Sequence, residues 1–136
     1  MSIIDSHVYL GTGAHINQDT DGLLRNMDDA GIEKAVACPV DRFLAVYNSE
    51  GNDTIIDAVR EHPDRIIGMA SANPWYGEGA VSELKRALDG GLHGLFFNPN
   101  YQGFRLSDHV IDPLFRVAAE YDAPVYVHTG TAGIAE

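Results

Sequence analysis

The sequence is poor in cysteine, in positive charge and in long apolar runs. Its single cysteine, Cys38, cannot form an intramolecular disulfide, which excludes a disulfide-stapled fold and fits a reducing compartment. Nine basic residues against 20 acidic ones give a formal net charge of -11, which repels phosphate backbones and anionic membrane surfaces. We therefore expect neither nucleic acid nor a membrane among its partners.

The chain also lacks the features of a secreted or membrane protein. Nowhere do about 18 apolar residues follow one another, and the first residues carry no basic region before an apolar run. These absences predict a cytoplasmic protein. A chain of 136 residues with 45% hydrophobic content can bury one core of ordinary size, so we expect a single domain over residues 1–136.

Apolar segments rich in β-branched residues alternate with segments of helical period. The expected strands are residues 3–8, 35–40, 66–72, 92–97 and 124–128, and the expected helices are 21–30, 52–62, 80–88 and 112–121. The strand starts are 32, 31, 26 and 32 residues apart, close to the repeat of an eight-unit barrel of about 250 residues. The pattern predicts an α/β fold of the TIM-barrel type, incomplete, with about five β/α units. An open doubly wound sheet is the alternative that the pattern leaves open.

Both architectures place a ligand site at the carboxyl ends of the strands. Polar residues follow all five expected strands: His7 and Tyr9, Asp41 and Arg42, Asn73, Asn98 and Asn100, and His128 with Thr129. The ordinary polarity of loops explains any one of them better than a functional role does.

The first strand carries a more specific pattern. Period-two alternation places Asp5, His7 and Tyr9 on one face, which is the interior in a barrel. A divalent metal would bind the imidazole there, with a carboxylate nearby to orient it. For an isolated histidine, a hydrogen bond to the neighbouring strand is the simpler explanation.

Two segments resemble motifs of the amidohydrolase superfamily. Residues 3–9, Ile-Ile-Asp-Ser-His-Val-Tyr, resemble its strand-one D-x-H-x-H motif, and residues 124–130, Pro-Val-Tyr-Val-His-Thr-Gly, resemble its strand-five P-x-x-x-H-x-G segment. Between them, segments typical of the amidohydrolase-related, decarboxylase-like members follow in order at residues 30–36, 61–65, 71–74, 102–106 and 112–115. Together they span nearly the whole chain. The resemblance favours the N-terminal portion of a barrel over an open sheet.

The resemblance implies a metal-dependent hydrolase or non-oxidative decarboxylase that acts on a small carboxylated or cyclic substrate. It assigns metal binding to His7 and His128, and a catalytic role beside the metal or its ligands to Asp5. The implied cofactor is one divalent ion, zinc or manganese. The expected fourth strand ends at Asn98 without a lysine that could be carbamylated, which favours a mononuclear site.

One departure from the family pattern weakens the metal assignment. The second strand-one histidine falls on Tyr9, and a phenol is a poor zinc ligand at neutral pH. The alternative is a degenerate site without metal, in a catalytically inactive truncated domain or pseudoenzyme that binds a small ligand or self-associates.

The substrate-binding predictions rest on side chains after the strands: Tyr9, Asn73, Trp75, Asn98 and Arg105. An aromatic lip with one arginine can recognise a planar carboxylated molecule, although packing between loops also explains the aromatic residues. Cys38 is expected to be a small core residue. If these residues are the whole molecule, we expect a homo-oligomer, because five units leave strand edges and apolar surface uncovered.

Overall fold

A computed structural model describes residues 1–130, so residues 131–136 of the predicted domain lie outside the described part. The strands are β1 (Ile4–Thr12), β2 (Asn17–Gln18), β3 (Lys34–Pro39), β4 (Ile66–Ala70), β5 (Gly94–Phe97) and β6 (Val125–Val127). The α-helices are α1 (Thr20–Ala30), α2 (Asp41–Ala45), α3 (Asn48–Glu61), α4 (Glu78–Asp89), α5 (Pro99–Gln102) and α6 (Asp112–Glu120), and two 3-10 helices are η1 (Pro74–Tyr76) and η2 (His109–Ile111).

The strands form one sheet in the order β2-β1-β3-β4-β5-β6. From β1 to β6 every pairing is parallel, and each strand is added on the same side of the one before it. A doubly wound sheet requires a reversal of strand order, which this sheet lacks. The fold is therefore part of a TIM-type barrel, as the sequence predicts, and the open doubly wound alternative is wrong.

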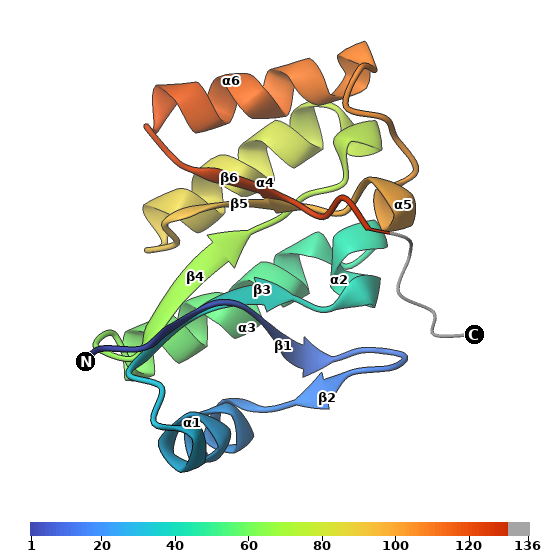
Figure 1. The fold of residues 1–136 in the computed structure, drawn as a ribbon. Helices are drawn as coiled ribbons and strands as arrows, with labels where there is room; N and C mark the ends of the chain where they lie inside the picture. Colours follow the sequence, from blue (N-terminus) through green and yellow to red (C-terminus); the bar gives the residue numbers. More distant parts are fainter. Residues whose placement is uncertain (131–136) are drawn as a thin grey trace.

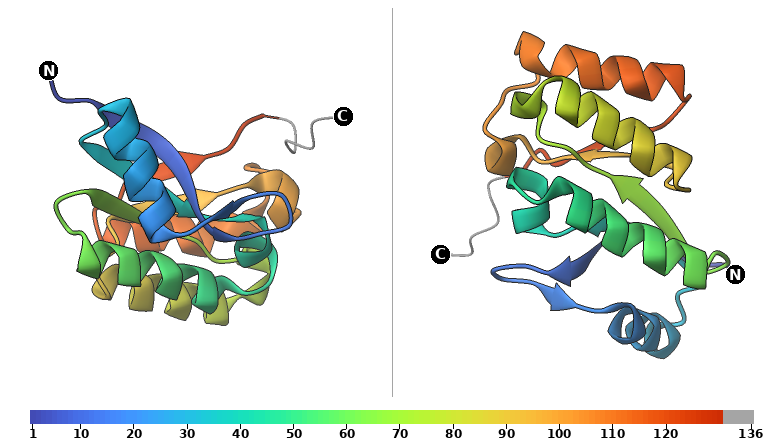
Figure 2. Two further views of the ribbon diagram at one scale, coloured as in Figure 1. Left: turned by 90° about the horizontal axis from the view of Figure 1, so that it is seen from below. Right: turned by 180° about the vertical axis from the view of Figure 1, so that it is seen from behind.

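Figures 1 and 2 show α3, α4 and α6 side by side on one face of the sheet, with α1 next to β1. Local signals fix both ends of α1 and the start of α6. The Asp19 side chain accepts a hydrogen bond from the Gly22 N–H at 2.7 Å at the start of α1, and Gly31 ends that helix in the left-handed conformation at φ 68°. Pro113 occupies the first turn of α6, where no N–H is needed.

Two separate clusters of buried side chains lie on the two faces of the sheet. We call the larger one the outer core; it is mostly aliphatic, and includes Leu23 of α1, Ile55 of α3, Leu84 of α4, Leu95 of β5 and Leu114 of α6. We call the smaller one the inner cluster; it consists of Cys38, Leu44, Met69 and Phe96, with Tyr9, Val36 and Tyr101 packed against it. The long helices α1, α3, α4 and α6 thus cover only one of the two faces, whereas the short helices α2 and α5 contribute Leu44 and Tyr101 to the other.

The first strand differs from its prediction. It continues to Thr12 and turns back into β2, which pairs antiparallel with Gly11 and Thr12. Its pairing with β3 shifts register between Asp5 and Val8, so strict alternation is interrupted there. The short elements β2, α2 and α5 were not predicted, because two to five residues cannot display a period. Within residues 1–130, no helix combines the length and apolar character needed to cross a bilayer.

Candidate metal and substrate site

A pocket of about 200 Å³ opens at the carboxyl ends of the parallel strands. It is lined by residues from β1, the β1–β2 turn, α2, the end of β5, α5 and the segment after β6: Tyr9, His15, Ile16, Asp41, Leu44, Asn98, Tyr101 and His128. Three of the predicted site residues, Tyr9, Asn98 and His128, therefore come together here.

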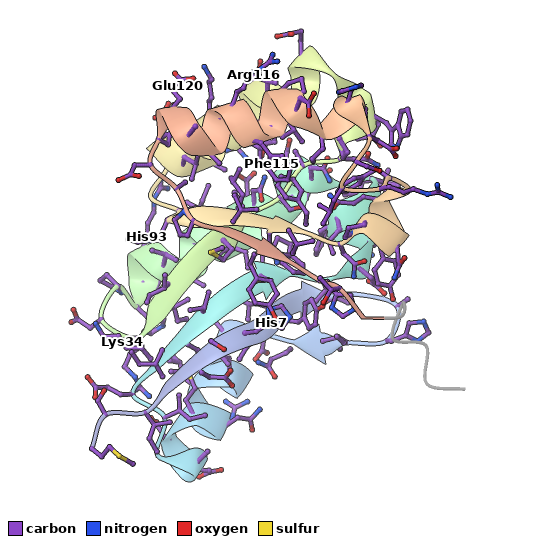
Figure 3. The ribbon with its side chains drawn as sticks, turned by 45° about the horizontal axis from the view of Figure 1, so that its top comes forward. His7, Lys34, His93, Phe115, Arg116 and Glu120 are labelled. Atoms are coloured by element: carbon purple, nitrogen blue, oxygen red, sulfur yellow. The ribbon has the colours of Figure 1, made fainter. Side chains whose placement is uncertain are left out.

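The predicted metal ligand His7 lies on the inner face, packed between aromatic rings. Its ring stacks on Tyr126 of β6 with 4.8 Å between centroids and 6° between planes, and meets the edge of the Tyr9 ring at 4.6 Å. The strands β1 and β6 stand at opposite ends of the parallel order, so this contact requires a sheet that curls into a barrel. Figure 3 shows His7 on the inner side of the sheet, with Phe115 on the other side, under α6.

The two ring nitrogens of His7 have different surroundings. Nδ1 lies 3.4 Å from the Cys38 Sγ atom, within hydrogen-bonding distance for sulfur. Nε2 is buried, and has no hydrogen-bond partner among the described residues. A buried polar atom without a partner is unfavourable, and a bound cation is one way to satisfy it.

The electrostatics of the site favour a neutral His7 ring. Burial lowers the pKa of His7, the charge that His128 can carry lowers it further, and Asp5 partly opposes both. The two predicted ligands are thus close enough for a charge on His128 to act on His7. Neutral imidazole is also the form that binds a metal ion. Burial raises the pKa of the Cys38 thiol well above its usual value, so its sulfur stays protonated.

Tyr9 takes the position of the second strand-one histidine. Burial raises its pKa, and the neighbouring groups of Cys38 and Tyr101 raise it further. Its side chain is therefore a neutral phenol, which donates a hydrogen bond and ligates a metal poorly.

The Asp5 side chain forms a hydrogen bond with the backbone of its own strand. One of its carboxylate oxygens, Oδ1, accepts a hydrogen bond from the backbone N–H of His7 at 3.1 Å. That N–H lies within the register shift, and Asp5 itself pairs with Ala35 of the outer core. His7 and Tyr9 lie on the same face of the strand, as predicted, and their rings are in contact. The register shift interrupts the alternation between Asp5 and His7, so the prediction that Asp5 shares this face is wrong.

The loops behind the pocket are held by buried amide side chains. Gln102 accepts from the Asn98 N–H at 2.9 Å and donates to the carbonyl oxygens of Ala72 at 3.0 Å and Leu44 at 3.3 Å. Asn98 in turn accepts from the N–H groups of Asn100 and Tyr101. The side chains of Asn98 and Gln102 are only 1% and 2% exposed. Asn98 therefore positions this loop as well as lining the pocket.

Three predicted substrate-binding residues lie outside the pocket lining. Asn73 donates from Nδ2 to the Ala45 carbonyl at 2.7 Å, and its Oδ1 accepts from the Trp75 N–H. The Trp75 indole N–H donates to the Gly103 carbonyl at 3.0 Å, and the ring is 60% exposed. Arg105 is exposed. Their substrate-binding roles stay predictions.

Two residues contribute to the site although no site role was predicted for them, and the first, Asp41, is among the polar residues that follow the expected strands. Asp41 lines the pocket and its Oδ1 accepts from the N–H groups of Ala14 at 3.2 Å and Arg42 at 2.7 Å, which ties the β1–β2 turn to the start of α2. Tyr126 supports His7, and period-two alternation along residues 124–128 would have placed it on the same face as His128.

The described residues do not by themselves form a metal site. No group of three or more His, Cys, Asp or Glu side chains within residues 1–130 is arranged to hold a metal ion. The unsatisfied Nε2 of His7, with a second imidazole in the same electrostatic environment, nevertheless fits a divalent cation that takes further ligands from elsewhere.

Comparison with known proteins connects this geometry to a family. The chain is 35% identical over 78 residues to a 2-amino-3-carboxymuconate-6-semialdehyde decarboxylase of Dictyostelium discoideum, a match that covers 57% of this chain and 22% of the relative. It is 31% identical to a 5-carboxyvanillate decarboxylase from Novosphingobium aromaticivorans, solved with manganese and 4-hydroxy-3-methoxy-5-nitrobenzoic acid, with a TM-score of 0.70 over 78% of this chain and 33% of that one.

A third comparison supports the fold alone. The 2,6-dihydroxybenzoate decarboxylase from Rhizobium is 18% identical, with a TM-score of 0.74 over 93% of this chain and 49% of that one. The chain thus spans between about a fifth and a half of the length of these three relatives. The family model described as Amidohydrolase matches residues 5–136. Because that match takes in nearly every residue, this chain belongs to the amidohydrolase family.

Proposed function

We propose that this chain supplies five parallel strands and two metal ligands of a divalent-metal-dependent carboxy-lyase that acts on a small aromatic or unsaturated carboxylic acid. The observation that carries the proposal is the buried, unsatisfied Nε2 of His7, in a neutral ring coupled to His128 of the neighbouring pocket. Two of the relatives at 30% identity or above are decarboxylases, which favours removal of CO2 over hydrolysis.

The proposed reaction breaks the bond between the carboxyl carbon and the carbon that bears it. CO2 leaves, the electron pair stays on that carbon, and a proton replaces the carboxyl group. A bound divalent ion would hold substrate oxygens and spread their negative charge. His7 and His128 would hold that ion, and manganese in the 31% identical relative supports a divalent cofactor without deciding between manganese and zinc.

The chain's own side chains have distinct parts in this proposal. The Tyr9 phenol donates a hydrogen bond to a substrate oxygen, since its raised pKa keeps the proton on it. Leu44 and Ile16 give the pocket an apolar wall that suits a ring. Asp5 is a positioning residue, because its carboxylate holds the His7 backbone through the 3.1 Å hydrogen bond.

Metal analysis and CO2 release test the proposal in the natural protein. The substrates are benzoic acids with a hydroxyl group beside the carboxyl group, the arrangement in the names of two relatives' substrates. We expect about one manganese or zinc ion per chain and metal-dependent CO2 release. His7→Gln and His128→Gln should abolish both. His93→Gln, a change to an exposed ring at the amino end of β5, should leave both unchanged.

Tyr9 favours a second candidate, a ligand-binding domain without catalysis. A protonated phenol where relatives of this type carry a histidine removes one metal ligand. Protein that binds an aromatic carboxylic acid but holds no metal would establish this second function and overturn the first.

A further inference from the structure

Cys38 is the hydrogen-bond partner that the structure gives to Nδ1 of His7, with the sulfur 3.4 Å away. It lies on β3 in register with Tyr9, and its side chain is only 1% exposed. Met69 and Phe96 pack with it in the inner cluster, so the sulfur is held in place. The other aromatic neighbours of the imidazole, Tyr126, Tyr9 and Phe96, contact it through their rings.

A neutral imidazole has two hydrogen-bond arrangements with this thiol. In the first, the thiol S–H donates to Nδ1, so the ring proton sits on Nε2. That places a donor in the buried position where no acceptor lies, and an orphaned buried N–H is rare and costly. In the second, Nδ1–H donates to the sulfur, and Nε2 presents a lone pair instead.

We propose that Cys38 is a positioning residue: its sulfur accepts the Nδ1 proton of His7 and thereby holds the tautomer whose Nε2 lone pair binds a divalent cation. The identity of the cation rests on the proposed function, whereas the tautomer does not. The partner that fixes a metal-binding histidine is usually a carboxylate, a backbone carbonyl or a water. Here a buried sulfur takes that place, and Asp5 instead holds the backbone of His7.

Nitrogen-15 NMR of the metal-free protein tests the tautomer directly, because protonated and unprotonated ring nitrogens differ strongly in chemical shift. The His7 signals are identified by their loss in His7→Gln. We expect Nδ1 to be protonated and Nε2 unprotonated at neutral pH. Cys38→Ala should increase the population protonated on Nε2, and Cys38→Ser, which restores an acceptor, should reverse that change. A wild-type protein protonated on Nε2 would overturn the proposal.

A matched variant separates positioning from packing. Met69→Leu removes the other sulfur of the inner cluster and keeps its volume, so it should leave the His7 tautomer unchanged. A tautomer shift in Met69→Leu equal to that in Cys38→Ala would assign the effect to packing and overturn the proposal.

Metal titration supplies the second readout. Manganese or zinc should bind about tenfold more weakly to Cys38→Ala than to the wild type, the lower end of the range for loss of an orienting partner, and Cys38→Ser should recover most of that affinity. Cobalt substitution should show no thiolate charge-transfer band; such a band would make Cys38 a ligand and overturn the positioning role. If the tautomer is as expected and no metal binds, the role of Cys38 stands and the proposed carboxy-lyase falls.

Discussion

The outer and inner faces of the sheet differ in the side chains that cover them and in how completely those side chains are buried. On the outer face, each helix covers the strands next to it in the chain, and residues such as Leu84 and Leu95 are fully buried. On the inner face, a small cluster of sulfur and aromatic side chains is exposed at its margin, where Tyr126 is 39% accessible. Local β/α units complete the outer face, whereas only contacts across the barrel complete the inner one. Stability and chemistry are therefore separated between the two faces.

The largest effect that we predict is self-association through the unpaired edges of the sheet. We expect the 136-residue chain on its own to self-associate, because β6 pairs only with β5 among the described residues and leaves its other edge free. A dissociation constant of about 1 μM for the self-associated form would correspond to an association free energy of about 8 kcal/mol. Light scattering measures the mass. Val125→Lys on β6 should shift it towards the monomer, and Ala119→Lys on the exposed side of α6 should not. A stable monomer of the unsubstituted chain would contradict the expectation.

Truncation of a large side chain on each face should sharpen the contrast. Leu84→Ala opens a cavity in the outer core and should lower the free energy of unfolding by about 3 kcal/mol. Tyr126→Ala removes a side chain that is 39% exposed and should cost less than half as much. Urea denaturation of both variants measures the difference. Equal losses would mean that the inner face contributes as much to stability as the outer core.

The next largest effect on stability should come from loss of a buried amide side chain behind the pocket. Gln102→Ala leaves the buried N–H of Asn98 without its acceptor, and should lower the free energy of unfolding by about 2 kcal/mol. Hydrogen exchange at Asn98 should accelerate in the same variant. Asn100→Ala is the control, because Asn100 is exposed and should shift the unfolding midpoint little. Unchanged exchange at Asn98 would argue against this role of Gln102.

The smallest effect should be the pH dependence due to His7. Its folded-state pKa lies below the ordinary 6.5, so the unfolded chain binds the proton more readily. The contribution of His7 to stability is therefore complete above about pH 6.5 and is lost as the pH falls towards the folded-state pKa. Because the ring is partly solvent-exposed, we expect this loss to be smaller than the effects of the substitutions above. His7→Gln should remove this part of the pH dependence in denaturant titrations, and His93→Gln should not.

The sequence predicted the parallel strands and the long helices, because a buried sheet and an amphipathic helix repeat their patterns over many residues. It did not predict β2, α2 or α5, whose order depends on contacts such as that between Asp41 and Ala14, far apart in the chain. Strict alternation along the first strand was wrong at the register shift near His7. No pattern in the sequence indicates that Gln102 is buried, because its hydrogen-bond partners come from loops that only the folded barrel brings together.

The contact between His7 and Tyr126 could not be predicted from the sequence, for a related reason. Alternation places each ring on the inner face, yet only the curvature of the sheet brings β1 and β6 close enough for the rings to stack. Cys38 was expected to be a small core residue, and it is buried. Its contact with Nδ1 depends on the register of β1 against β3, which residue spacing does not fix.

The short strand β2 sets a limit on how a barrel can be completed around this chain. It occupies the edge of β1 away from β3, and its hydrogen bonds begin at Gly11. A further strand laid along that edge can pair with residues 4–10 and must then leave the sheet. The β1–β2 hairpin therefore limits how far towards the carboxyl end of β1 a neighbouring strand can extend the barrel on this side.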